Sequence, residues 1–79
     1  MKKKFSFDLL PYGSQVLILF ENQITIAFIF ETKVTVYNNY EIPAVEYFLN
    51  WQDDEGEERK VWFWQSKVFE TREALVASL

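Results

Sequence analysis

The chain has 79 residues, enough for one small domain with a single hydrophobic core. It contains neither cysteine nor histidine, which excludes disulfides, thiolate metal sites and the commonest general base and metal ligand. The formal charge of −4 argues against a nucleic-acid binder, whose affinity rests on lysine and arginine contacts to phosphate. An aromatic share of 19% favours a folded, aromatic-rich domain over a disordered chain.

The first residues do not resemble a targeting segment. Residues 2–4 are lysines, but Asp8 and Pro11 interrupt the apolar stretch after them, and no small-residue cleavage site appears. The longest apolar region, residues 16–30, is broken in its middle by the polar residues 21–23, so it is too short on either side to span a bilayer. We therefore expect a soluble, cytoplasmic protein with no membrane contact.

Three strands are expected in the first half of the chain. Apolar and polar residues alternate over residues 3–9, which predicts an amphipathic strand, and Pro11 and Gly13 mark the turn after it. Residues 16–20 are uniformly apolar and predict a central strand, which residues 21–23 then reverse.

The even positions of residues 24–36 keep one mainly apolar parity through Glu31 and Lys33, which fall on the other parity, and this predicts one long, bent strand. A bulge near Glu31 is compatible with this pattern. Residues 38–43, with an asparagine pair and Pro43, predict a loop.

The second half of the chain is organised around a β-hairpin. Residues 45–52 and 59–66 alternate as strands, and Gly56 lies in the acidic tip between them, where the chain must reverse. Thr71 is a suitable N-cap for a short helix over residues 72–79. The predicted fold is a single α+β, mainly β, domain over residues 1–79, with an antiparallel, meander-like sheet of about five strands and one short C-terminal helix.

The apolar residues exceed what this fold can bury by itself. The strands within residues 16–30 are apolar on both faces, yet one short helix covers only part of one face. Either the sheet curls on itself as a half-barrel, or a second copy or a partner completes the burial.

The acidic hairpin tip is the first candidate binding site. An EF-hand calcium loop with Gly56 at its sixth position would need carboxylates where Trp51 and Trp62 stand, so that motif fails. The tip is then either a solvated turn or a carboxylate cluster that docks on a basic surface in place of nucleic-acid phosphates. The residues concerned are Asp53, Asp54, Glu55, Glu57 and Glu58.

The second candidate is a tryptophan pair on the returning strand. Trp62 and Trp64 share one parity and Val61 and Phe63 the other, so one pair faces the core and the other faces outward. An exposed tryptophan beside Arg59 is typical of a protein-binding hot spot. Without histidine the serines have no activating base, and two glycines cannot form a phosphate loop, so we expect no enzyme, cofactor or metal.

Two resemblances bear on function. The second hairpin, followed by Phe69, Thr71, Glu73 and Ala74, resembles the end of the arm-type DNA-binding domains of phage integrases, where basic sheet residues enter a DNA groove; here the tip is acidic. In size, acidity and aromatic content the chain is similar to small phage-encoded inhibitors such as anti-CRISPR proteins. That similarity implies a host-directed binder.

The leading hypothesis is a non-catalytic protein-interaction module, an inhibitor of phage type whose acidic tip meets the basic surface of a nucleic-acid-handling complex, with Trp62 or Trp64 as anchor. The first alternative is a structural subunit or accessory protein that forms a homodimer or larger oligomer. The second alternative is a binder of single-stranded nucleic acid that stacks bases on the tryptophans.

Overall fold

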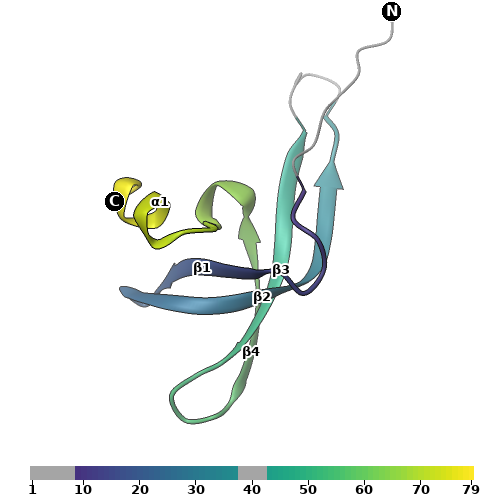
Figure 1. Cartoon of the computed structure of the whole chain (residues 1–79). Coiled ribbons are helices and arrows are strands. Elements are labelled where there is room, and N and C mark those ends of the chain that lie inside the picture. Colours follow the sequence, from purple (N-terminus) through teal and green to yellow (C-terminus); the bar gives the residue numbers. More distant parts are fainter. Residues whose placement is uncertain (1–8, 38–42) are drawn as a thin grey trace, which may run out of the picture.

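The part of the chain that the structure describes forms a four-stranded antiparallel meander with one short C-terminal helix (Figure 1). A computed structural model describes residues 9–37 and 43–79. Each strand pairs with the next along the chain, in the order β1-β2-β3-β4. The elements are β1 (Gln15–Phe20), β2 (Gln23–Thr35), β3 (Ala44–Gln52), β4 (Glu58–Trp64), the 3₁₀ turn η1 (Gln65–Lys67) and α1 (Arg72–Ala77).

The mainly β fold and its meander order are confirmed, but the expected five strands are one more than the four found among residues 9–37 and 43–79. The extra strand is the one expected over residues 3–9. That segment lies outside the described residues except for Leu9, which belongs to no strand. The loop expected over residues 38–43 also lies outside them, apart from Pro43.

The β1–β2 turn is tight and uses backbone that non-glycine residues rarely adopt. Phe20 pairs with Gln23, so the loop holds only Glu21 and Asn22. Both have positive φ, at 50° and 64°. A two-residue hairpin needs this geometry to match the twist of its strands, and asparagine tolerates it better than glutamate does.

A bulge in β2 changes which side chains face the core. The register shifts between Ile29, which pairs with Leu49, and Glu31, which pairs with Phe48. Before the shift the odd positions Ala27 and Ile29 are buried. After it Thr32 pairs with the buried Tyr47, so even positions now take the core side. The predicted single strand is confirmed, and so is the bulge near Glu31 that its pattern allowed. Because the bulge inserts one extra residue, the even positions do not all lie on one face, as the unbroken parity had predicted.

The core lies on one face of this curled sheet. Tyr47, at its centre, is fully buried, and its hydroxyl accepts a hydrogen bond of 3.1 Å from the Leu10 amide. Further apolar side chains, partly buried, pack against the core cluster: Leu10, Phe20, Val61, Phe63 and Val68. The buried residues that form the core cluster are Val16, Ile18, Ala27, Ile29, Val45, Tyr47, Leu49 and Trp51.

The chain after β4 returns to the free edge of β1. The Leu17 amide donates to the Phe69 carbonyl at 2.7 Å, and the Phe69 amide donates back at 3.0 Å. The sheet therefore curls toward a half-barrel, one of the two solutions expected for its surplus apolar residues. The segment between β4 and α1, residues 65–71, thereby leads into α1, which packs against β1.

The helix begins as the sequence predicts. The Thr71 side chain accepts a hydrogen bond of 3.1 Å from the Ala74 amide, which confirms the N-cap. The sequence predicts that Leu75, Val76 and Leu79 form one docking stripe on this helix. Leu75 is fully buried, whereas Val76 and Leu79 are exposed. One leucine thus holds a helix of under two turns.

Candidate functional site

The acidic tip between β3 and β4 is a closed loop of five residues, 53–57, between the paired Gln52 and Glu58. The Asp53 amide donates to the Glu57 carbonyl at 2.9 Å, and the Gly56 amide donates to the Asp53 carbonyl at 2.9 Å. Gly56 has φ of +82°, which a side chain would strain. A turn with glycine in the left-handed region at this position is a standard hairpin connection.

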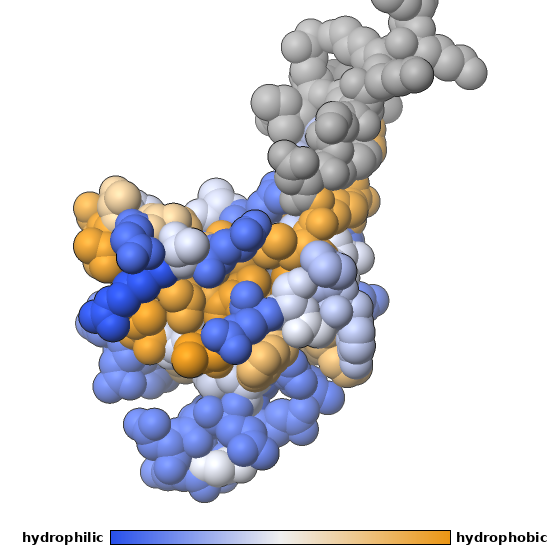
Figure 2. All heavy atoms as spheres, viewed as in Figure 1, coloured by the Kyte–Doolittle hydropathy of each residue, from blue (hydrophilic) through white to orange (hydrophobic). Residues whose placement is uncertain are grey.

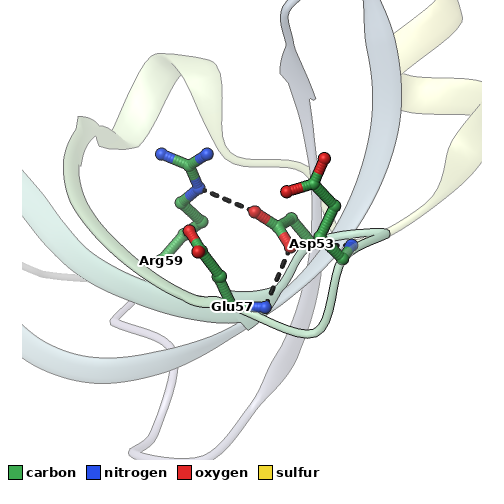
Figure 3. Close-up of polar contacts among 4 residues, drawn as sticks. Asp53, Glu57 and Arg59 are labelled. Atoms are coloured by element: carbon green, nitrogen blue, oxygen red, sulfur yellow. Dashed lines mark hydrogen bonds and ion pairs between the residues drawn. The ribbon is translucent and has the colours of Figure 1, made fainter.

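The Asp53 carboxylate holds this turn together. One of its oxygens, Oδ1, accepts from the amides of Glu55 and Glu57, both at 2.9 Å, and Oδ2 accepts from Arg59 Nε at 3.1 Å. Figure 3 shows the Arg59 side chain reaching toward Asp53 across the hairpin. These contacts lower the pKa of Asp53; the hydrogen bond from the Glu57 amide has the largest effect, and together they outweigh the opposing effect of desolvation.

The predicted tip residues therefore divide into two roles. Asp53 is engaged inside the turn, so its carboxylate shapes the tip. Asp54, Glu55 and Glu57 are exposed and form no ion pair with any described residue. Glu58 lies 3.7 Å from Lys60 Nζ in a solvent-exposed pair, which contributes little to stability.

A groove of about 260 Å³ lies between this tip and the β1–β2 turn. The rings of Phe20 and Trp51 meet edge to face in its lining, with centroids 5.0 Å apart. Glu21 adds a carboxylate from the opposite turn, about thirty residues earlier in the chain. Sequence reasoning assigned Glu21 only to a turn, because nothing local indicates that the two hairpin tips adjoin. The full lining is Phe20, Glu21, Gln23, Thr25, Trp51, Gln52, Asp53, Asp54, Glu55 and Arg59.

The two predicted tryptophans lie on the outer surface of β4. Trp62 is 40% exposed and Trp64 52%, whereas Val61 and Phe63 pack toward the core cluster. The expected division of the two pairs between core and exterior is thus confirmed.

Trp62 belongs to a continuous series of aromatic contacts across the sheet. Its ring lies 4.9 Å from Phe48, Phe48 lies 6.0 Å from Phe30, and Phe30 lies 6.1 Å from Tyr12. Trp64 lies two residues further along β4 and is exposed on the same face as Trp62. We call Tyr12, Phe30, Phe48, Trp62 and Trp64 the aromatic strip.

The hydrophilic tip is set apart from the apolar part of the molecule. Figure 2 shows a lobe of hydrophilic residues where Figure 1 places the end of the β3–β4 hairpin, with hydrophobic residues gathered above it. Within residues 9–37 and 43–79, carboxylates do not group into a metal-binding set of three or more. No helix in that part of the chain is long and apolar enough to cross a membrane.

Comparison of the chain with protein-family models, curated proteins and solved structures found no match. The resemblances to integrase arm-binding domains and to anti-CRISPR proteins therefore stay predictions. Two surfaces of the chain itself remain as candidates for function: the acidic tip and the aromatic strip.

Proposed function

We propose that the protein is a non-catalytic interaction module whose acidic β3–β4 tip binds a basic surface on a partner protein. The class of partner that fits is a nucleic-acid-handling complex, which the protein would inhibit in the cytoplasm by occupying a surface made for phosphates. The proposal rests on one observation: Asp53 fixes the turn while the carboxylates of Asp54, Glu55 and Glu57 stay outside it.

A prearranged tip favours binding because less conformational entropy is lost when the partner docks. The Asp53 carboxylate also engages Arg59, the nearest cation, so that arginine is already paired within the turn. Glu21 enlarges the acidic surface from the facing turn. A cluster of one sign speeds association with an oppositely charged partner and makes binding weaken as salt is raised.

The test is affinity capture from a lysate of candidate host cells, with and without nuclease, using the wild type and the double variant Asp54→Lys with Glu55→Lys. Asp53 is left intact because its loss would deform the tip itself. The matched control is Glu70→Lys with Glu73→Lys, which changes the net charge equally at two exposed positions beside or within α1.

We expect the wild type and the control to retain a nucleic-acid-handling assembly after nuclease treatment, and the tip variant to lose it. The isolated partner should then bind the wild type less tightly as salt rises, with a smaller salt dependence for the tip variant. Equal capture by all three proteins, or equal loss in the two charge-reversed variants, would contradict the proposal. Circular dichroism and thermal unfolding check that each variant is folded.

A further inference from the structure

We propose that the aromatic strip is the interface of a homodimer, so that each strip packs against the strip of a second copy of this chain. Four of its five residues are substantially exposed: Tyr12 at 77%, Trp64 at 52%, Phe30 at 41% and Trp62 at 40%. The fifth, Phe48, is half-buried between Phe30 and Trp62. The strip crosses β2, β3 and β4 on the side away from the core.

The strip has the area that a dimer contact needs at its centre. At 150–250 Å² for each aromatic side chain, the four exposed fractions leave about 400 Å² of ring surface in water on each copy. A standard interface buries about 800 Å² on each partner, of which the centre is apolar and the rim polar. More exposed apolar residues continue the outer surface along β1 and β2: Leu19, Ile24, Ile26 and Phe28.

The charges around the strip identify a second copy as its occupant. Lys60 Nζ lies over the Phe30 ring, 5.1 Å from its centroid, and 3.7 Å from Glu58. Lys33 pairs across the ladder with Glu46, which in turn lies opposite Trp64. Each lysine therefore has a glutamate beside it, and Glu31, which lies opposite Phe48, adds a third glutamate to the same face. In a two-fold contact the same patch meets itself, so a patch of one sign would repel its copy, whereas in a patch of mixed sign the lysines of one copy meet the glutamates of the other.

The acidic excess of the chain lies elsewhere. Asp54, Glu55 and Glu57 project from the tip, beyond the strand positions that carry Trp62 and Trp64. A strongly basic partner fits the tip better than it fits the strip, whose surrounding charges are of mixed sign. The dimer would consequently present two acidic tips, which raises the apparent affinity for a partner with repeated basic sites.

The test is the mass of the full chain in solution by analytical ultracentrifugation, from 1 to 200 μM. We expect a concentration-dependent species of twice the 9.5 kDa chain mass. Trp64→Glu should raise the dissociation constant at least tenfold, because it places an unpaired charge in the contact. The control is Val76→Glu, the same change of character at a side chain of α1 that is 50% exposed and outside the strip; it should dimerise as the wild type does.

Tyr12→Glu, at the other end of the strip, is the second variant and should weaken the dimer as well, so the test stands even if Trp64→Glu fails to fold. A monomer at every concentration would overturn the proposal and leave the strip to a different protein or to another segment of this chain. A dimer that both strip variants leave unchanged would overturn it too. Asp54→Lys with Glu55→Lys should stay dimeric, which separates this inference from the proposed function of the tip.

Discussion

The burial of Leu75 allows a quantitative prediction of how much the docking of α1 contributes to the stability of the protein. It is the one residue of α1 that is buried, and no part of its surface is exposed. A six-residue helix is unstable in water by itself, so its presence depends on this contact. Leu75→Ala should therefore destabilise the protein, since α1 packs against β1 and Leu75 is its buried side chain.

The size of the loss can be worked out from the atoms removed. Leucine to alanine deletes three carbon groups, worth about 2.4 kcal/mol at roughly 0.8 kcal/mol each. The cavity left behind adds to this, but α1 lies at the edge of the fold and can partly collapse, so we expect about 3 kcal/mol in total. A chain of this length has roughly 4–12 kcal/mol of stability. The variant should still fold.

The assay is urea unfolding followed by tryptophan fluorescence. At a slope of about 1.5 kcal/mol/M, the expected loss moves the midpoint down by about 2 M. The control is Val76→Ala, the exposed neighbour on the same helix, which should cost less than about 0.5 kcal/mol. If the two variants were equally stable, the docking of α1 through Leu75 would be wrong.

Three further predictions concern single contacts. Tyr47→Phe removes the acceptor of the Leu10 amide and should cost about 1 kcal/mol in urea unfolding; an unchanged midpoint would mean that the bond is absent. The pKa of Asp53 is lower in the folded than in the unfolded state, so its carboxylate contributes fully to stability above the unfolded pKa of about 4, and this contribution is lost as the pH falls from there through the folded pKa. Asp53→Asn should remove this part of the acid dependence of the unfolding free energy. A carboxyl NMR titration midpoint at or above about 4 would refute the lowered pKa. Glu21→Asn should raise stability by about 0.5–1 kcal/mol, because asparagine adopts positive φ more readily, and thermal unfolding would show no gain if the turn were unstrained.

Local signals in the sequence predicted the elements with the clearest chemistry. The hairpin around Gly56 and the helix that starts after Thr71 are found, because a left-handed glycine and an N-cap act within a few residues. The alternation of Val45, Tyr47 and Leu49 indicated one buried face of β3, and all three are in the core.

The two faces of β2 could not be distinguished in the same way. Both faces of its first half are apolar, so periodicity contains no information about which face is buried. The bulge determines which face of the first half of β2 is buried, and the position of a bulge depends on the fit between strands rather than on residue type. Ala27 and Ile29 became core, while the larger Phe28 and Phe30 stayed outside.

The candidate site shows a similar division between composition and geometry. The sequence located the acidic tip but treated its carboxylates as equivalent, whereas Asp53 is used by the turn itself. An aspartate three residues before a turn glycine is a recognisable signal for that role. The approach of Glu21 carries no such signal, because it depends on how the two hairpins fold together.

The separation of charge from apolar area explains how one small chain could serve both proposed contacts. Two copies of a chain with a net charge of −4 repel each other, and the repulsion would be greatest if the carboxylates bordered the strip. Here Asp54, Glu55 and Glu57 stand on the tip, while Lys33 and Lys60 offset two of the three glutamates around the aromatic rings. Repulsion between the tips of two copies is screened over about 8 Å at physiological salt. Dimerisation through the strip is therefore compatible with acidic tips that stay free to bind a basic partner.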